Sequence, residues 1–285
     1  MSEQFTAYFQ YVLPKQWITS IAGRVASWKG GERTQRIIRR FIDRYQVDMR
    51  EAAEPNPAAY STFNEFFTRP LRTDARPISS SPLVCPVDGA ISQLGRIDGE
   101  HLMQAKGHRY TVTALLGGDQ QTAERYHQGH FATIYLSPRD YHRIHMPCDG
   151  TLTSMVYVPG NLFSVNPLTA RTIPGLFARN ERVACFFEGP NGPFVLVLVG
   201  ATIVGSMATV WYGTVNPPRS KDVRRWDYAP GRVSLKKGAE MGRFLLGSTV
   251  VLLFPPDKQL TFAADWQPGR PVRLGEPMAD IASGH

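Results

Sequence analysis

The stretch that decides the fold is Met241-Gly-Arg-Phe-Leu-Leu-Gly-Ser-Thr-Val-Val-Leu-Leu-Phe254. After Gly247-Ser248 the chain continues as a β-branched and apolar run, which predicts a buried strand over 249–254. The Gly247-Ser248 junction also places a hydroxyl beside the carbonyl of a residue that has no side chain. Because glycine leaves that carbonyl open to approach, the serine oxygen could attack its own backbone. An ordinary turn before a strand is the alternative interpretation of so short a motif.

Upstream of this stretch, from about residue 85 onward, short runs of Val, Ile and Leu alternate with Gly, Pro and Asp. This pattern predicts a mainly antiparallel β body, either a sandwich or a partly closed barrel. Short helices are predicted near 63–67 and 111–116, and a tail after about Glu276, where the periodicity ends. The predicted strands cover residues 90–94, 131–136, 151–158, 195–199, 210–215 and 249–254.

Residues 1–50 predict three short amphipathic helices, so the expected fold class is α+β. Apolar side chains recur at helical spacing over 5–13, 17–25 and 37–45. The same fifty residues contain nine Lys or Arg against four Asp or Glu. A basic amphipathic helix suits the interface of an anionic bilayer, and packing on the protein's own core or on a second copy is the alternative.

We therefore divide the chain into a membrane-association region, 1–55, and a β-rich domain, 56–285. The chain has a net charge of +8 and a pI near 9.5. This charge suits nucleic acid or acidic lipid, but the sequence contains no recognised nucleic-acid module. A generally basic surface without such a partner is the alternative.

The sequence offers no strong sign of a spanning helix or a disulfide framework. The apolar run 194–212 approaches transmembrane length, but it is interrupted by two glycines and lacks basic flanks. Two buried strands joined at a glycine explain it better. The three cysteines are widely spaced and odd in number, which fits a reducing cytosol, and no signal-peptide pattern opens the chain.

Two further segments supply groups that could activate Ser248. The run Tyr135-Leu-Ser-Pro-Arg-Asp-Tyr-His-Arg-Ile-His-Met-Pro147 carries His142 and His145, and Cys85-Pro-Val-Asp-Gly-Ala-Ile-Ser92 carries Asp88. Asp88, His145 and Ser248 are thus an acid, a base and a nucleophile. Such a triad is admissible because triads are defined by geometry and role rather than by chain order.

Other interpretations of these residues have less support in the sequence. The Gly-x-Ser-x-Gly elbow of α/β-hydrolases is missing, because β-branched residues follow Ser248 and the relevant histidines precede it. His142, His145 and Cys148 have a spacing that would suit zinc, but no fourth ligand follows, so we expect no metal. Without further motifs, the structural interpretation of the two histidines is favoured, because most histidines are neither ligands nor catalysts.

Taken together, these motifs resemble the bacterial, membrane-associated phosphatidylserine decarboxylases. The Tyr-His-Arg-Ile-His-Met-Pro run, the Leu-Gly-Ser-Thr run and Asp88-Gly89 carry the resemblance, which extends over nearly the whole chain. Further matching stretches are Tyr60-Ser-Thr-Phe-Asn-Glu-Phe-Phe67, Arg69-Pro-Leu71, Gln104-Ala-Lys-Gly-His108, Phe163-Ser-Val-Asn166, Asn180-Glu-Arg182 and Val199-Gly-Ala-Thr-Ile-Val-Gly205.

The resemblance implies a self-cleaving, pyruvoyl-dependent lyase. Ser248, with His145 as base and Asp88 holding the imidazole, would attack the Gly247 carbonyl and cut the chain. Ser248 would thereby become an N-terminal pyruvoyl cofactor. This cofactor would form a Schiff base with phosphatidylserine and release carbon dioxide to give phosphatidylethanolamine. His142 is the candidate proton donor, since an imidazole titrates near working pH.

The resemblance also implies two chains from one gene, a β chain of residues 1–247 and an α chain of residues 248–285, which stay associated. Ser164 and Asn166 are candidate substrate-binding residues, with an Asn-Pro turn as the alternative for Asn166. We expect the protein on the cytoplasmic side of the cell membrane, bound peripherally to phosphatidylserine and an anionic surface. A homodimer is a further expectation, and nucleic acid is not expected as a partner.

Three other functions stay open on sequence grounds. A close variant of the decarboxylase would act on an ether-lipid serine headgroup. A hydrolase could use the same triad on lipid esters, and a non-catalytic protein could bind lipid. The hydrolase and the lipid-binding protein both predict a chain that remains uncut, which separates them from the decarboxylase.

Overall fold

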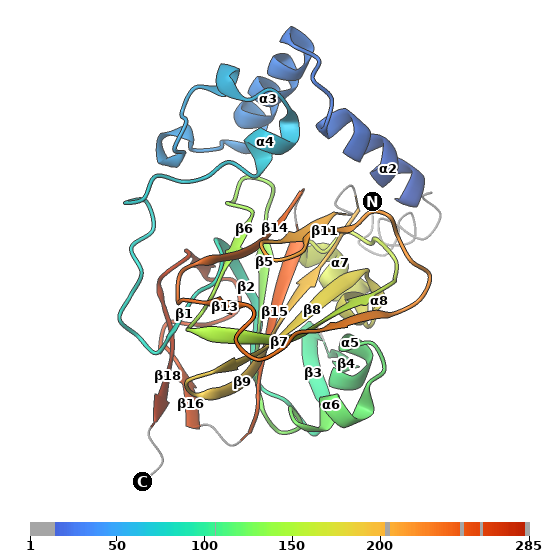
Figure 1. Cartoon of the computed structure of the whole chain (residues 1–285), viewed down its shortest axis with the longest axis vertical. Coiled ribbons are helices and arrows are strands. Elements are labelled where there is room, and N and C mark those ends of the chain that lie inside the picture. The colour runs from blue at the N-terminus through green and yellow to red at the C-terminus, as the bar shows by residue number, and fades with distance from the viewer. Residues whose placement is uncertain (1–14, 106, 203–205, 246–247, 257–258, 283–285) are drawn as a thin grey trace.

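A computed structural model of the chain describes residues 15–105, 107–202, 206–245, 248–256 and 259–282, with the backbone alone at 15–18, 248, 259 and 282. A helical layer, which residues 15–67 form, lies over one end of a β body (Figure 1). The described helices are α2 (Lys15–Ala26), α3 (Glu32–Tyr45), α4 (Phe63–Phe67), α5 (Val112–Leu115), α6 (Gln120–Glu124), α7 (Pro167–Thr172) and α8 (Leu176–Arg179), with 3-10 turns η1 (Met49–Glu51) and η2 (Pro57–Ala59).

The β body contains one large sheet of nine strands. Its neighbouring strands pair antiparallel, so the predicted α+β class with a mainly antiparallel body is confirmed. In spatial order the strands are β12 (Arg224–Asp227), β7 (Gly150–Val158), β8 (Arg182–Gly189), β9 (Gly192–Val199), β15 (Ser248–Phe254), β5 (His130–Leu136), β2 (Gly89–Arg96) and β17 (Pro271–Val272), with β13 (Ser234–Leu235) paired to β7.

Three smaller sheets complete the body. They also pair antiparallel. In spatial order they are β1 (Leu83–Val84), β18 (Pro277–Ala282) and β16 (Gln259–Phe262); β11 (Gly213–Asn216), β10 (Met207–Thr209), β14 (Glu240–Phe244) and β6 (Arg143–His145); and β3 (His101–Ala105) with β4 (His108–Thr111).

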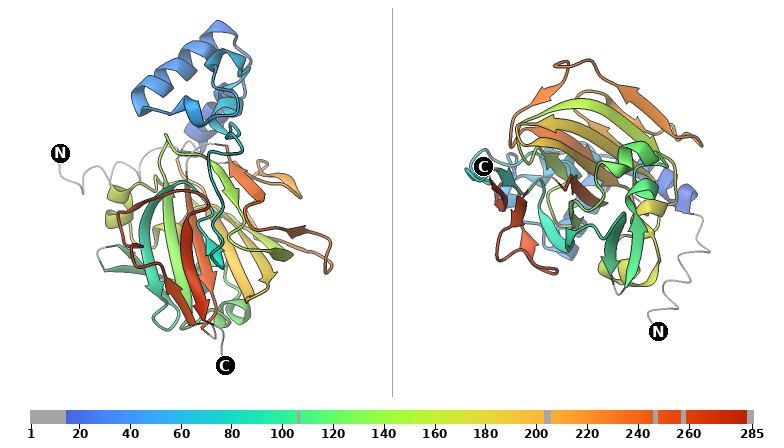
Figure 2. Two further views of the ribbon diagram at one scale, coloured as in Figure 1. Left: turned by 90° about the vertical axis from the view of Figure 1, so that its left-hand side faces the viewer. Right: turned by 90° about the horizontal axis from the view of Figure 1, so that it is seen from below.

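Strand β15 lies inside the large sheet, between β9 and β5. Its Val250 and Leu252 belong to one core cluster, and Val251 and Leu253 belong to another. Because successive side chains of a strand point to opposite faces, both faces of the sheet are buried here, which explains the unbroken apolar run. The three-stranded and four-stranded sheets contribute to the first cluster. Helices α5 to α8, with β3 and β4, contribute to the second (Figure 2).

The helical layer has a small core of its own. A capping box starts α4: Thr62 Oγ1 accepts from the Glu65 N–H at 3.1 Å, and the Glu65 carboxylate accepts from the Thr62 N–H at 3.3 Å. The phenylalanines of α4 are buried against Ile38 of α3. Part of the apolar face of α3 therefore packs on the protein itself, as the alternative interpretation of the sequence proposed.

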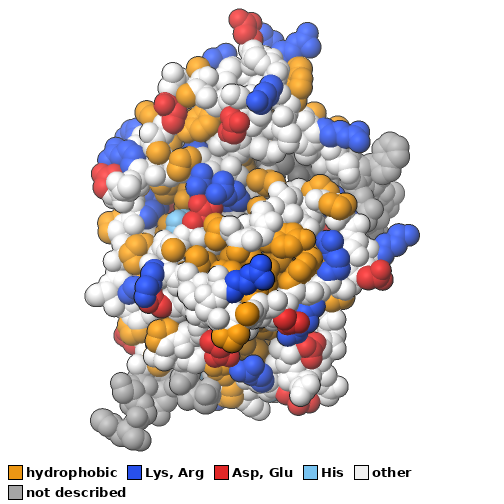
Figure 3. All heavy atoms as spheres, in the orientation of Figure 1, with side chains coloured by type: hydrophobic (Ala, Val, Ile, Leu, Met, Phe, Trp, Pro, Cys, Tyr) orange, Lys and Arg blue, Asp and Glu red, His pale blue; other side chains and the backbone are white. Residues whose placement is uncertain are grey.

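Other apolar side chains of this layer face solvent. Ile21 and Val25 on α2 are 55% and 46% exposed, and Trp28 just after α2 is 43% exposed. Basic side chains also appear on this part of the surface (Figure 3). Among the described residues, the structure has no helix both long enough and apolar enough to span a bilayer.

Most of the predicted elements are confirmed, and two are wrong. Residues 210–215 do not form one strand, because Val210–Tyr212 make the turn between β10 and β11, and Gly213 has the positive φ that this reversal needs. Residues 277–282 are no tail, because they form β18 between β1 and β16. The predicted helix over 5–13 lies outside the described residues, and the domain boundary at residue 55 stays a prediction.

Replacing a side chain at the centre of β15 should destabilise the whole β body. Leu252→Ala removes a fully buried side chain, so we expect the free energy of unfolding to fall by about 3 kcal/mol. Urea unfolding should be measured in a Ser248→Ala background, which removes the hydroxyl predicted to cut the chain and keeps one polypeptide. Glu124→Gln, at an exposed position of α6, is the matched control and should change stability by less than about 0.5 kcal/mol. Equal effects of the two substitutions would contradict this account of the core.

Candidate active site

Ser248 is the first residue of β15, and its backbone pairs with Leu136 at the end of β5. On the other side of the predicted cut, β14 pairs with β6, and the Phe244 N–H donates to the His142 carbonyl at 3.0 Å. Gly247 lies outside the described residues, and only the backbone of Ser248 is described. The chain before the predicted cut and the chain after it are therefore both paired with the histidine segment, 135–147.

His142 is fully buried beneath the helical layer. Its ring stacks on Phe67 of α4 with the centroids 4.1 Å apart. Burial, together with the positive charge of Arg69, lowers the pKa of His142 to about 3. The ring is therefore neutral at physiological pH.

The hydrogen bonds of His142 fix which nitrogen carries its proton. Nε2 lies 3.1 Å from the Ser137 carbonyl, and a carbonyl only accepts, so Nε2 carries the hydrogen. Nδ1 is then a lone pair, buried and without a hydrogen-bond partner among the described residues. In this resting state His142 can accept a proton at Nδ1 before it donates one.

His145 is held in the opposite tautomer. Its Nδ1 lies 2.8 Å from the Gly238 carbonyl and so carries the hydrogen. Its Nε2 is the lone pair and accepts from the Tyr141 hydroxyl at 3.1 Å. Burial lowers the pKa of His145, so this imidazole is also a neutral base.

Asp88 does not hydrogen-bond to His145 in this structure. Its carboxylate accepts from the Arg76 Nε at 2.9 Å and from the Leu274 N–H at 2.9 Å. The two predicted partners are nevertheless neighbours: the His145 N–H donates to the carbonyl of Pro86, two residues before Asp88. The negative charge of Asp88 also acts to raise the pKa of His145, although burial outweighs it.

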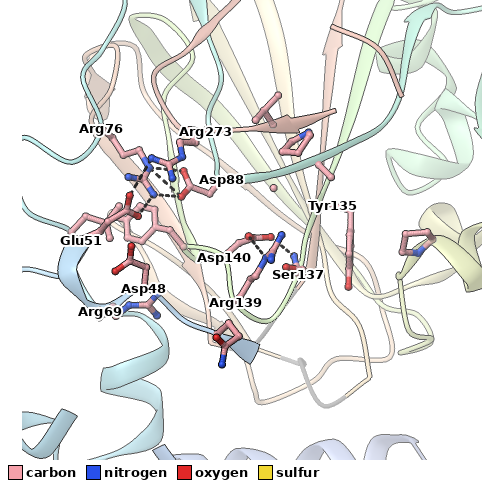
Figure 4. Close-up of a pocket in the computed structure, with 18 residues that line it drawn as sticks. Asp48, Glu51, Arg69, Arg76, Asp88, Tyr135, Ser137, Arg139, Asp140 and Arg273 are labelled. Atoms are coloured by element: carbon pink, nitrogen blue, oxygen red, sulfur yellow. Dashed lines mark hydrogen bonds and ion pairs between the residues drawn. The ribbon is translucent and has the colours of Figure 1, made fainter. Parts of the chain in front are cut away.

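A cavity of about 440 Å³ opens between the helical layer and the β body. Figure 4 shows Arg76 and Arg273 facing Glu51 and Asp88 on one side of it, and Ser137, Arg139 and Asp140 grouped on the other. Ser137 directly follows Leu136, the pairing partner of Ser248. The cavity therefore extends from the predicted triad acid toward the start of β15.

Neither of the two predicted substrate-binding residues lines this cavity. Asn166 caps α7, because its Oδ1 accepts from the Thr169 N–H at 2.9 Å. That oxygen is committed to the cap, as the alternative interpretation of an Asn-Pro turn suggested, while Pro167 lines the cavity. Ser164 is half-buried two residues earlier.

Sequence reasoning missed the residues that hold the triad candidates in place. Tyr141 stands inside the histidine motif and gave a usable signal. Arg76 and the carbonyl of Gly238 gave none, because neither lies near the motifs in sequence. Among the described residues, no group of three or more His, Cys, Asp or Glu side chains is arranged to hold a metal ion.

Two family models and several relatives match this chain. A family model described as phosphatidylserine decarboxylase matches residues 63–280, and a second, described as PSD, matches residues 5–46. The chain is 62% identical to a phosphatidylserine decarboxylase proenzyme of Azoarcus sp. (strain BH72), over 99% of this chain and 98% of that protein. It is 64% identical to the proenzyme of the same name from Polaromonas naphthalenivorans (strain CJ2), over 99% of both chains.

The chain belongs to the phosphatidylserine decarboxylase family. It is a carboxy-lyase, made as a proenzyme, that acts on phosphatidylserine and takes its pyruvoyl cofactor from a serine of its own chain. The residues present fit such a group. A serine opens the buried strand β15, and His142, whose backbone carbonyl accepts from Phe244 of β14, has an Nδ1 without a hydrogen-bond partner among the described residues.

The buried, neutral state of His142 predicts that the stability of the fold depends on pH. Its pKa is near 3 in the folded enzyme and near 6.5 when unfolded, so unfolding takes up a proton below pH 6.5. The stability that this group contributes is fully present above pH 6.5 and is lost as the pH falls from 6.5 toward 3. Between pH 6 and pH 4, Ser248→Ala precursor should therefore lose about 1.4 kcal/mol per pH unit more than the same precursor carrying His142→Gln.

The measurement is urea unfolding of both proteins at several pH values. All other titrating groups are common to the two proteins and cancel in the comparison. His101→Gln, at an exposed position of β3, is the control and should leave the slope unchanged. Parallel slopes for the precursor and its His142→Gln variant would show that His142 is not buried in its neutral form.

Proposed function

We propose that this enzyme cuts itself between Gly247 and Ser248 and then decarboxylates phosphatidylserine at an anionic membrane surface. One observation carries the proposal. The chain leading to this bond and the strand following it are both paired with the segment that holds His142 and His145. A cut here leaves the new terminus beside two neutral imidazoles.

His145 is the proposed base for the cut. Its Nε2 lone pair accepts from the Tyr141 hydroxyl in this structure and would take the proton of the Ser248 hydroxyl in its place, while Gly238 fixes the ring through Nδ1. An imidazolium then forms, and the negative charge of Asp88 stabilises it. Asp88 makes no hydrogen bond to this ring, because its hydrogen bonds go to Arg76 and Leu274. The orienting role that a triad usually gives to its acid is filled here by a backbone carbonyl.

His142 is the proposed proton carrier in the decarboxylation that follows. When present, the pyruvoyl carbonyl supplies an electron sink for the pair left by the departing carboxylate. Because Nδ1 of His142 starts as a lone pair, it first accepts a proton from the incoming ammonium group and later returns one to the substrate carbon. Phe67 stacks on the ring and excludes water from that face.

The two chains are proposed to stay together after the cut. Strand β15, in the 38-residue fragment, keeps hydrogen bonds on both edges to β9 and β5 of the larger chain. Strand β18 of the same fragment pairs with β1. The fragment is therefore part of the core rather than an appendage.

Residues 1–55 are proposed as the region that binds the cytoplasmic face of the cell membrane. Ile21, Val25 and Trp28 present apolar surface, and the layer carries an excess of basic residues. Ile37 and Tyr45 on α3 are about two-fifths exposed and extend this surface. A homodimer contact through the same side chains is the alternative.

Intact mass under denaturing, reducing conditions tests the self-cleavage. The wild-type enzyme should give two fragments, with residues 248–285 lighter than the encoded peptide by one ammonia. Ser248→Ala should give one uncut chain of 31.8 kDa. His145→Gln should slow the cut by at least about 100-fold, the usual contribution of a general base, and Asp88→Asn should slow it less.

His101→Gln is the matched histidine control, because His101 is exposed on β3. It should cut at the wild-type rate. A wild-type enzyme that is active and uncut would refute the proposed cofactor, and the lipid hydrolase would then be favoured. A normal cut in His145→Gln would remove His145 from the role of base.

Vesicle sedimentation tests the membrane region. With vesicles that contain phosphatidylglycerol, Val25→Glu should weaken binding about 10-fold or more, because it removes apolar burial and adds a charge of the wrong sign. Tyr212→Glu, at a similarly exposed apolar position on the β10–β11 turn, is the control and should bind like the wild type. Unchanged binding of Val25→Glu with a changed oligomeric state would instead indicate the homodimer contact.

A further inference from the structure

Among the described residues, no acidic side chain pairs with the buried guanidinium of Arg69. Its side chain follows α4 and is only 4% exposed. Nε is buried and has no hydrogen-bond partner among the described residues, and Nη1 reaches the Phe66 carbonyl only at 3.5 Å. The guanidinium carbon lies 5.3 Å from the centre of the Phe66 ring. A buried charge with so few partners is unfavourable unless something outside the chain compensates it.

Two other arginines whose side chains are almost fully covered, Arg182 and Arg76, are fully engaged. Arg182 donates to the carbonyls of Ala114, Leu115 and Asn180. Arg76 binds the carboxylates of Asp88 and Glu51. Those two carboxylates are the ones whose charge reaches Arg69, but their hydrogen bonds go to Arg76 and other partners. Arg69 therefore lacks the partners that satisfy Arg182 and Arg76.

Arg69 also lines the cavity that extends toward the start of β15 (Figure 4). Ser137, on the same cavity, adjoins the pairing partner of Ser248. Arg69 stands two residues after Phe67, whose ring stacks on His142, and its charge adds to burial in lowering the pKa of that proposed proton carrier. An anion that enters from the helical layer would thus be held beside the reacting groups.

We propose that Arg69 binds the phosphodiester of the phospholipid headgroup. The planar guanidinium offers paired N–H donors that match a phosphate. The substrate carboxylate is a poorer partner, because its charge must leave as carbon dioxide, and holding it would stabilise the reactant more than the transition state. The phosphodiester is unchanged by the reaction, so binding it orients the headgroup at no such disadvantage. This inference rests on the proposed function.

The test is decarboxylation of phosphatidylserine in detergent micelles by purified, self-cleaved enzyme. Arg69→Gln should raise the KM on the order of 100-fold, the usual effect of losing one partner of a buried charge pair, with a smaller change in kcat. Two soluble probes separate the anions: glycerophosphoethanolamine has the phosphodiester without the carboxylate, and free serine has the reverse. Glycerophosphoethanolamine should inhibit the wild type and lose that inhibition in Arg69→Gln.

Arg109→Gln is the matched control, because Arg109 is exposed on β4 and pairs with Asp98. It should keep the wild-type KM and inhibition. If glycerophosphoethanolamine still inhibits Arg69→Gln while serine no longer does, Arg69 binds the carboxylate and the proposal is overturned. If Arg69→Gln does not cut itself, Arg69→Lys replaces it, and its KM should rise about 10-fold because the paired donors are lost.

Stability gives a readout independent of activity. In Ser248→Ala precursor, Arg69→Met should raise the Tm, because it removes an uncompensated buried charge. A lowered Tm would assign Arg69 a structural role and overturn the proposal. Mass analysis of the wild type in the same series shows whether self-cleavage itself occurs. The two proposals can therefore fail separately.

Discussion

The hydrogen bonds of β15 to β9 and β5 are the constraint on which the rest of the structure depends. Both partner strands precede the bond 247–248 in the chain, so the strand that follows this bond is held entirely by residues on its other side. A backbone cut would ordinarily release a short peptide. A cut at this bond, as proposed, would make the new terminus the start of a strand that is buried on both faces, so the fold would hold both chains together.

Burial sets the protonation of the two histidines. Each donates one ring N–H to a backbone carbonyl, and the hydrophobic surroundings disfavour a second proton. A neutral imidazole can take a proton from a serine hydroxyl or an ammonium group, whereas an imidazolium cannot. The same burial that stabilises the core therefore keeps both rings neutral, with one nitrogen of each left as a lone pair.

The elements with a strong repeating pattern were predictable from the sequence. Strands β5, β7, β9 and β15 follow from apolar runs bounded by turn residues, and α3 follows from helical spacing. Strand β18 was not predicted, because its six residues show little alternation and it forms only by pairing with β1 and β16. The turn after β10 was missed because Val210-Trp211-Tyr212 has strong strand propensity, which Gly213 overrides.

The candidate site was predictable only as a set of residue types. Asp88, His145 and Ser248 were found from motifs, but their partners depend on distant segments that fold against them. Arg76 bonds to Asp88 across twelve residues, and Gly238 bonds to His145 across ninety-three. Such long-range contacts leave no periodic signal in the chain. The position of Arg69 then suggests how the site is set for its substrate. An anion held there would offset the positive charge that depresses the pKa of His142, so binding of the headgroup would make His142 a better proton acceptor at the moment one is needed.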